Sequence, residues 1–324
     1  MITREGKTIM RYSKKAARLT ALTVGVALAV AACGGDDGGG SGELAGKSLT
    51  VGSKEFTEQV ILGQIAILAL EDAGATVKDE TGIEGTANVR TALESDAIDM
   101  YWEYTGTGWV DILGNDVADA ESDKQALFDA VAEQDKKNGV EWILKTEAND
   151  TYAFATSQAT SDELEVTTIS DYAELVNSDP ESASLCAAAE FLDRADGFPG
   201  VEKAYGFDLP DEQITELDLE IIYTALPKAD PCNFGEVFES AGQIPANDLL
   251  VLEDDKQYFP GYEVALTINE DVLADNPEIE DVLAPIAEKL TTEELQQMNA
   301  SVDVDGQPHE AVAQKWLEDN DLIG

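Results

Sequence analysis

The chain has 324 residues, of which 66 are Asp or Glu and only 20 are Lys or Arg, so its formal net charge is −46. Such a surface repels phosphate backbones, which excludes nucleic acid as a partner. The acids are spread between apolar segments, so we interpret them as a solvated shell of the kind that keeps a protein soluble in strong salt.

The first 32 residues are a predicted export signal. Six bases and one acid precede an apolar run, residues 19–32, that is too short to span a membrane. Small residues then lead into Cys33, which resembles the lipobox of bacterial lipoproteins, where the cysteine is lipidated and becomes the new N-terminus. Residues 33–46 are rich in Gly, Asp and Ser and predict a flexible tether. We therefore expect the mature chain, with 14 bases, 65 acids and a charge of −51, to be lipid-anchored on the outer face of the cell membrane.

Predicted strands and helices alternate from Lys47 onward. A strand at residues 49–52 is followed by a helix at 58–72, with Thr57 as its N-cap. A strand at 75–78 and a helix at 87–95 come next. Residues 98–104 alternate between apolar and polar side chains, which predicts a half-buried strand. The glycines and threonines of residues 105–108 then predict a tight, ligand-facing loop at the end of that strand.

The alternation continues to the end of the chain. Helices are predicted at residues 123–138, 170–176 (capped by Ser170), 199–205 and 217–226. Strands are predicted at residues 140–145, 152–156, 184–188, 236–240, 249–252 and 264–268. Three helices finish the chain, at residues 277–290, 293–301 and 308–320. Strands interleaved with helices in this way predict an α/β fold with mostly parallel sheet.

The cysteines and the single histidine limit the chemistry. With Cys33 assigned to lipid, Cys186 and Cys232 remain, and a pair of cysteines outside the cytoplasm predicts a disulfide. His309 is alone, and the sequence has no phosphate-binding loop, nucleophile elbow or zinc-type histidine pair, so we expect no metal and no cofactor. This argues against an enzyme, although a carboxylate-based one that uses Glu103 and Glu190 stays open as an alternative.

Five segments carry a family resemblance. They are residues 53–59 (Ser-Lys-Glu-Phe-Thr-Glu-Gln), 104–107 (Tyr-Thr-Gly-Thr), 191–206 (Phe through Arg194 to Gly), 222–226 (Ile-Tyr-Thr-Ala-Leu) and 254–260 (Asp-Asp-Lys, then Phe-Pro). In order and spacing they resemble the substrate-binding proteins of ABC importers for glycine betaine, carnitine, choline and related quaternary amines. The resemblance implies a type II periplasmic-binding-protein fold, a two-lobed "Venus flytrap" with two hinge crossings. We expect crossings near residues 149–152 and 252–259, which puts residues 47–148 and 255–324 in lobe 1 and 149–254 in lobe 2.

The resemblance also implies a site. A quaternary ammonium group cannot donate an N–H hydrogen bond, and its natural host is a cage of aromatic ring faces, each worth roughly 0.5–2 kcal/mol. The implied cage residues are Tyr104, Tyr152, Tyr223 and Tyr262, with Tyr258 and Phe259 competing for the place of Tyr262. Gln59, Thr107 and the N-terminus of the helix after Thr57 are implied donors to a ligand carboxylate. Asn149 and Asp150 complete the expected site. Asp150 departs from an asparagine-rich family pattern, which leaves betaine against choline open.

The sequence therefore predicts a monomeric, extracytoplasmic solute receptor that passes a quaternary amine to a membrane permease and does not alter it chemically. Two alternatives stay open: a receptor of the same fold for amino acids or other small cations, and an extracytoplasmic enzyme on the same scaffold.

Overall fold

The computed structural model describes residues 42–324, so the predicted signal peptide, Cys33 and most of the predicted tether lie outside the described residues. The last tether residues are already packed, because Leu44 is fully buried and its N–H donates to the Ala73 carbonyl oxygen at 2.9 Å. The folded part therefore begins before Lys47. Within the described range, no helix is long and apolar enough to cross a membrane.

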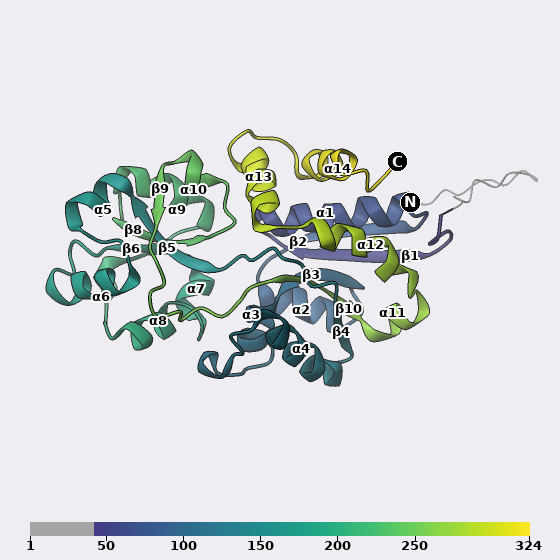
Figure 1. Ribbon diagram of the computed structural model, residues 1–324, viewed down its shortest axis with the longest axis horizontal. Helices are drawn as coiled ribbons and strands as arrows, with labels where there is room; N and C mark the ends of the chain where they lie inside the picture. The colour runs from purple at the N-terminus through teal and green to yellow at the C-terminus, as the bar shows by residue number, and fades with distance from the viewer. Residues whose placement is uncertain (1–41) are drawn as a thin grey trace, which may run out of the picture. The chain divides into compact units, whose positions relative to one another are not determined.

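The described residues form two five-stranded sheets, one in each lobe (Figure 1). The first has the order β2-β1-β3-β10-β4, with bounds Thr76–Ile83, Ser48–Lys54, Met100–Tyr104, Val264–Asn269 and Val140–Ile143. The second has the order β7-β6-β8-β5-β9, with bounds Ile214–Glu216, Leu185–Ala187, Phe234–Phe238, Tyr152–Ser157 and Leu249–Val251.

Both sheets are mixed, so the prediction of mostly parallel sheet is wrong. In lobe 1, β10 is antiparallel to β3 and β4, while β1 is parallel to β2 and β3. In lobe 2, β5 is antiparallel to β8 and β9, while β6 is parallel to β7 and β8. The antiparallel strands β10 and β5 are those that enter a lobe from the other one. They do not arrive by a helical crossover within their own sheet, which is the connection that enforces parallel pairing.

The chain crosses between the lobes twice, from β4 to β5 over residues 144–151 and from β9 to β10 over residues 252–263. The expected crossings near residues 149–152 and 252–259 overlap these segments, although Tyr152 is already the first residue of β5. The two segments run side by side, because Asn149 forms an antiparallel bridge with Glu263 and the Asp150 N–H donates to the Tyr262 carbonyl oxygen at 3.1 Å.

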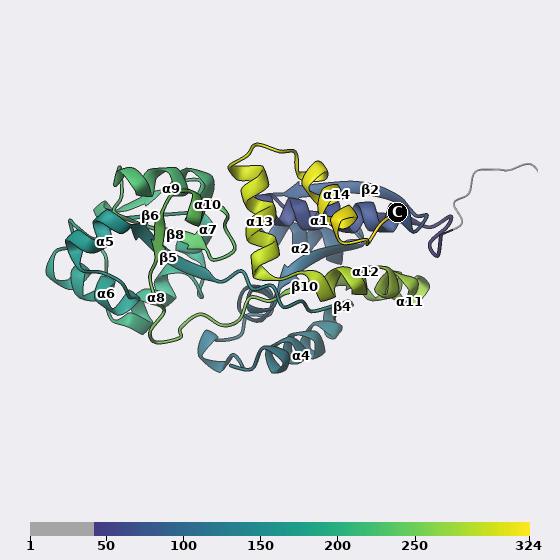
Figure 2. The ribbon, with the colours of Figure 1, turned by 45° about the horizontal axis from the view of Figure 1, so that its top comes forward.

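The helices of lobe 1 cover both faces of its sheet. They are α1 (Thr57–Asp72), α2 (Thr86–Glu94), α3 (Thr105–Thr107), α4 (Lys124–Asp135), α11 (Glu270–Asp275), α12 (Glu278–Lys289), α13 (Thr292–Asp303) and α14 (His309–Asp319). Thr57 is the first residue of α1 rather than its N-cap, which is Phe56, and its hydroxyl donates to Asp303 at 2.6 Å. Helix α13 also reaches lobe 2, where the Gln296 side chain donates to the Glu239 carbonyl oxygen at 2.8 Å (Figure 2).

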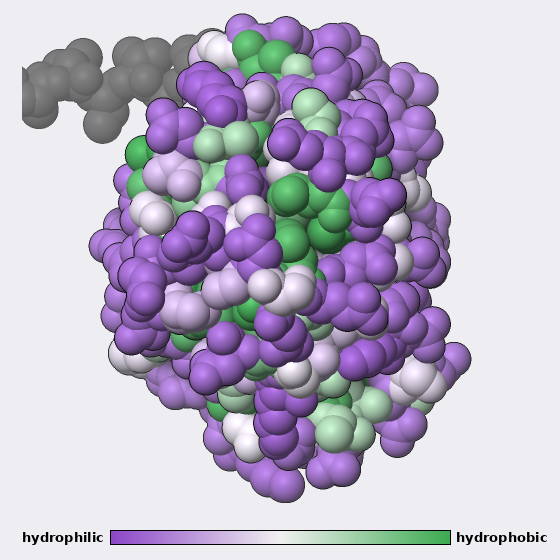
Figure 3. Space-filling model, turned by 90° about the vertical axis from the view of Figure 1, so that its left-hand side faces the viewer, coloured by the Kyte–Doolittle hydropathy of each residue, from purple (hydrophilic) through white to green (hydrophobic). Residues whose placement is uncertain are grey.

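The helices of lobe 2 are α5 (Gln158–Leu164), α6 (Ile169–Ser178), α7 (Ala189–Asp193), α8 (Phe198–Tyr205), α9 (Leu219–Ala225) and α10 (Gln243–Ala246). Helix α6 begins with a capping box of Thr168 and Asp171, so the expected cap at Ser170 is wrong. Cys186 in β6 and Cys232 just before β8 form a disulfide with 5.6 Å between their Cα atoms. Hydrophilic residues cover most of the face at the end of this lobe (Figure 3).

Strand β3 and the residues after it differ from the prediction. All five β3 residues are buried, because the strand lies between β1 and β10 with helices on both faces of the sheet. The predicted loop is helical: α3 continues into a π-helical turn over residues Gly108–Ile112. Its glycines are required by close packing, since a Cβ at Gly106 would lie 2.7 Å from the Tyr262 ring and one at Gly108 would lie 2.6 Å from the Trp142 ring.

Candidate functional site

A cavity of about 830 Å³ lies between the lobes. It forms where parallel strands of both sheets end: Lys54 and Tyr104 are the last residues of β1 and β3, and Phe238 is the last residue of β8. The carboxyl ends of parallel strands are the usual place for ligands in α/β sheets, because the chain leaves the sheet there in turns and helix starts.

Five aromatic side chains form a continuous wall of this cavity. In spatial order they are Tyr104, Phe56, Phe238, Tyr152 and Tyr262, and the successive distances between ring centroids are 6.3, 5.5, 4.8 and 5.4 Å. Two of the tyrosine hydroxyls are bonded to carboxylates, Tyr104 to Glu58 at 2.9 Å and Tyr262 to Asp196 at 2.6 Å. These bonds fix the two rings in place beside the cavity, so little side-chain entropy is lost when a ligand binds.

The structure brings most of the expected site residues to this cavity. Tyr104, Thr107, Asp150, Tyr152 and Tyr262 line it. Of the three candidates for one cage position, Tyr262 faces the cavity, whereas Tyr258 and Phe259 line a separate groove of about 1080 Å³.

Three expected residues lie behind the wall. The Tyr223 hydroxyl oxygen accepts a hydrogen bond from the Phe238 N–H at 2.9 Å, which places Tyr223 outside the large cavity. Gln59 is fully buried, and its side-chain oxygen accepts from the Lys54 N–H at 3.2 Å. The side-chain oxygen of Asn149 accepts from the Tyr262 N–H at 2.8 Å, and Asn149 lines the separate groove.

Sequence reasoning missed Phe56 and Phe238 as wall residues. Phe56 lies within the segment 53–59 that carries the resemblance, so a signal for it existed. Phe238 lies in a strand, Phe-Gly-Glu-Val-Phe, with apolar side chains on both faces, and nothing in that pattern separates a cavity wall from a core position.

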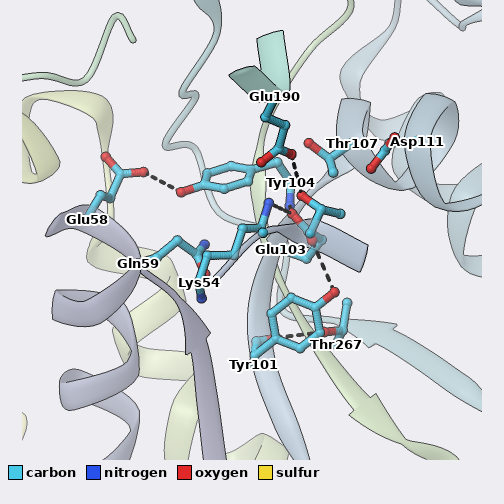
Figure 4. Close-up of polar contacts among 12 residues, drawn as sticks. Lys54, Glu58, Gln59, Tyr101, Glu103, Tyr104, Thr107, Asp111, Glu190 and Thr267 are labelled. Atoms are coloured by element: carbon cyan, nitrogen blue, oxygen red, sulfur yellow. Dashed lines mark hydrogen bonds and ion pairs between the residues drawn. The ribbon is translucent and has the colours of Figure 1, made fainter. Parts of the chain in front are cut away.

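Lys54 brings a buried positive charge to the cavity. Its ammonium nitrogen lies 2.7 Å from a Glu103 oxygen and 5.0 Å from the centre of the Tyr104 ring (Figure 4). Glu103 is fully buried and also accepts from the Tyr101 hydroxyl at 3.1 Å and the Tyr104 N–H at 2.8 Å. Glu103 therefore holds Lys54 against the ring and does not itself line the cavity.

Arg194 joins the lobes beside the cavity. Its guanidinium lies 5.4 Å from the centre of the Tyr152 ring and donates to both Asp196 oxygens at 2.8 and 2.6 Å. It also donates to Glu190 at 3.1 Å and, across to lobe 1, to the Thr107 hydroxyl at 3.4 Å. Burial alone would raise the pKa of Glu190, but the positive charges of Lys54 and Arg194 lower it, so this carboxylate is ionised.

The cavity is strongly acidic. Its lining carries one lysine and eight carboxyl side chains: Glu55, Glu84, Asp150, Glu190, Glu216, Asp218, Glu220 and Glu236. Burial raises the pKa of Glu236 to about 8, against the opposing effect of a hydrogen bond from the Ala188 N–H at 2.7 Å. An excess of carboxyls in a partly enclosed space focuses negative potential and favours a ligand with a positive group.

A second, water-sized cavity of about 20 Å³ adjoins the cage. Glu58 and Asp150 both line it, and burial raises the pKa of each carboxyl.

Within the described range there is no group of three or more His, Cys, Asp or Glu side chains that could hold a metal ion.

Comparison with known proteins agrees with this geometry. Residues 47–319 match the family model described as the substrate binding domain of ABC-type glycine betaine transport system. The glycine-betaine-binding protein of Pseudomonas aeruginosa is 33% identical over 86% of this chain and 89% of its own length. An ergothioneine transport permease/ergothioneine binding protein of Helicobacter pylori is 32% identical over 84% of this chain, which spans 47% of that protein.

A solved structure shows the same architecture. Apo YehZ of Escherichia coli superposes with a TM-score of 0.63 at 31% sequence identity, over 85% of this chain and 99% of that one. With an aromatic, acidic cavity between two lobes and a family match over nearly all of the described residues, the chain belongs to the substrate-binding domains of ABC-type glycine betaine transport systems.

Proposed function

We propose that this chain is the extracytoplasmic receptor of an ABC importer, and that it carries a quaternary ammonium compound in the cavity between its lobes to a membrane permease. The observation that carries the proposal is the wall of five aromatic rings in a cavity with eight carboxyls. A trimethylammonium group is weakly hydrated and gains from several ring faces at once, at roughly 0.5–2 kcal/mol for each.

A ligand that also has a carboxylate fits the same cavity. Lys54 supplies a positive charge beside Tyr104, and Thr107 supplies a hydroxyl that Arg194 already contacts. These groups support a zwitterion such as glycine betaine, the ligand in the name of the Pseudomonas relative. Ergothioneine, named for the Helicobacter relative, also combines a trimethylammonium group with a carboxylate and is the second candidate.

The expected site residues take two roles in this proposal. Tyr104, Tyr152 and Tyr262 form the cage together with Phe56 and Phe238. Behind them, Tyr223 supports Phe238, Gln59 supports the Lys54 backbone, and Asn149 supports Tyr262.

Cellular placement and chemistry follow from the same proposal. The chain is lipid-anchored through Cys33 on the outer face of the membrane, acts as a monomer, and releases its ligand unchanged. The enzyme alternative would use Glu103 and Glu190. Glu103 is fully buried and engaged by Lys54, Tyr101 and the Tyr104 N–H. Glu190 lines the cavity, but its carboxylate is held by Arg194 at 3.1 Å and by the Thr86 hydroxyl at 2.8 Å.

Calorimetric titration with glycine betaine, choline, carnitine, ergothioneine and glycine tests the ligand class. We expect the methylated ammonium compounds to bind and glycine, which lacks the methyl groups, to bind much more weakly. Tyr104→Ala should abolish or greatly weaken binding, and Tyr104→Phe should retain much of it, because the ring face attracts the cation. Tyr258→Ala, in the separate groove, is the matched control. Equal affinity for glycine, or full affinity in Tyr104→Ala, would overturn the proposal.

A further inference from the structure

Glu58 and Asp150 form a buried pair of acids directly behind the cage. Glu58 lies in the first turn of α1 and is 3% exposed, while Asp150 lies in the first crossing segment and is 2% exposed. Both line the cavity of about 20 Å³, which has room for about one water molecule. Asp150 also lines the large ligand cavity, so it faces both spaces.

One buried oxygen beside this pair lacks a hydrogen-bond donor. The two Glu58 oxygens accept from the Tyr104 hydroxyl and the Asn299 amide, both at 2.9 Å. Asp150 accepts from the Ser240 hydroxyl at 2.5 Å, and the Ser240 backbone also hydrogen-bonds to this carboxyl. The Asn299 side-chain oxygen lines the same small cavity, is buried, and has no partner within the described range.

The charges are equally unbalanced. The positive charge of Lys54 acts to lower the pKa of Asp150, but its ammonium is paired with Glu103 at 2.7 Å. The other titratable groups that face the pair are neutral or acidic: Tyr104 of β3, Tyr223 of α9, and Glu220 and Asp303, which line the small cavity. Two carboxylates that line one desolvated, water-sized cavity cannot both ionise at low cost, and one bound proton removes the excess charge.

We propose that in the empty protein this pair holds one proton on Asp150, and that a quaternary ammonium group entering the cage displaces that proton into solvent. The step breaks only the O–H bond of the Asp150 carboxyl, and the proton passes to water or buffer. This inference rests on the proposed function, because the ligand's positive charge takes over the role of the proton.

The coupling makes Asp150 a selectivity residue. Affinity for choline, a net cation, rises with pH by up to about tenfold per pH unit while one proton is released, and levels off once Asp150 is ionised in the free protein. The affinity for glycine betaine rises less with pH, because the carboxylate of this ligand repels the ionised Asp150. The ratio of choline to betaine affinity therefore rises with pH. The raised pKa of both acids in the empty protein, caused first by burial and, for Asp150, next by the charge of Glu58, agrees with this direction.

Titration calorimetry of the full-length chain measures the released protons directly. Choline and glycine betaine are titrated at several pH values in buffers of different ionisation enthalpy, because the observed heat then varies with buffer in proportion to the protons released. We expect release of up to one proton with choline, and none in Asp150→Asn, whose amide keeps an oxygen for the Ser240 hydroxyl.

Two further variants assign the proton. Glu236→Gln, which removes the cavity acid whose pKa burial raises to about 8, should keep the release. Ser240→Ala should shift the pH midpoint of release upward, because it removes a hydrogen bond that favours ionised Asp150. An unchanged midpoint in Ser240→Ala, or release that survives in Asp150→Asn and disappears in Glu236→Gln, would overturn the assignment.

The remaining outcomes separate this inference from the function. Tight binding of both ligands with no proton release at any pH would overturn the inference and leave the function standing. The same holds if affinity follows sodium concentration instead of pH, which would mean that the small cavity holds a metal cation. Absence of binding by every quaternary amine would overturn the function itself.

Discussion

Glu236 is the cavity acid whose charge state can be measured through stability. Burial raises its pKa from 4.5 to about 8, so the folded chain keeps this proton over a range in which the unfolded chain releases it. Between these two pH values the folded state therefore binds more protons than the unfolded state. The stabilising contribution of Glu236 is complete below the lower value and is lost as pH rises through the higher one. At 1.36 kcal/mol per pH unit the full range amounts to roughly 5 kcal/mol, of which roughly 3 kcal/mol is lost by pH 7.

Glu236→Gln removes the titration and keeps an oxygen that can accept from the Ala188 N–H. As pH rises from about 4.5 to 7, we expect the free energy of unfolding of the variant to increase by roughly 3 kcal/mol relative to that of the wild type. Urea denaturation at fixed ionic strength, without ligand, measures both proteins by linear extrapolation. Parallel curves of unfolding free energy against pH would refute the reasoning, because Glu236 would then titrate alike in the folded and unfolded chains.

Other features of the chain give sharp expectations. Thr107→Ala should weaken glycine betaine more than choline, by roughly 1.5–3 kcal/mol for one hydrogen bond to a charged group, and equal losses in calorimetry would contradict that role. Phe238→Ala should weaken ligand binding more than Tyr223→Phe, because only Phe238 faces the large cavity; the reverse order would place Tyr223 in the cage. Alkylation of the denatured, unreduced protein should find no free thiol at Cys186 or Cys232, whose separation of 46 residues makes the disulfide worth roughly 4 kcal/mol; two modified thiols would disprove it. The melting temperature should rise steeply from low to molar salt, and a flat response would show that the acids are compensated locally.

A sequence pattern predicts a strand or helix best when one face of the element is buried and the other is exposed to solvent. The alternating pattern located β3, but it could not show that both faces of the strand are covered, because the helices responsible come from distant parts of the chain. The same limit applies to Gly106 and Gly108. Their spacing suggested a turn, whereas the structure needs them for the close approach of the Tyr262 and Trp142 rings.

Part of the candidate site could be predicted from the sequence. Tyr104 and Thr107 sit in a short segment whose order is distinctive, so their position at a strand end could be read from sequence. Phe238 lines the cavity and Tyr223 lies behind it, with its hydroxyl bonded to the Phe238 N–H, and no sequence pattern shows which of the two reaches the cavity. The burial of Glu58 could not be predicted from the sequence, because acidic side chains in the first turn of a helix normally face solvent.

The two crossing segments are bonded to each other as a narrow two-stranded ribbon, through the Asn149–Glu263 bridge and the Asp150 and Tyr262 backbones. A ribbon of this kind bends readily across its plane and resists shear along its length, so it directs any relative motion of the lobes into one opening angle. Asp150 and Tyr262 lie on the ribbon itself, and both side chains line the cavity. Phe56 of lobe 1 and Phe238 of lobe 2 meet away from the ribbon, with 5.5 Å between their ring centroids, so an increase in that angle would separate these two rings and interrupt the aromatic wall.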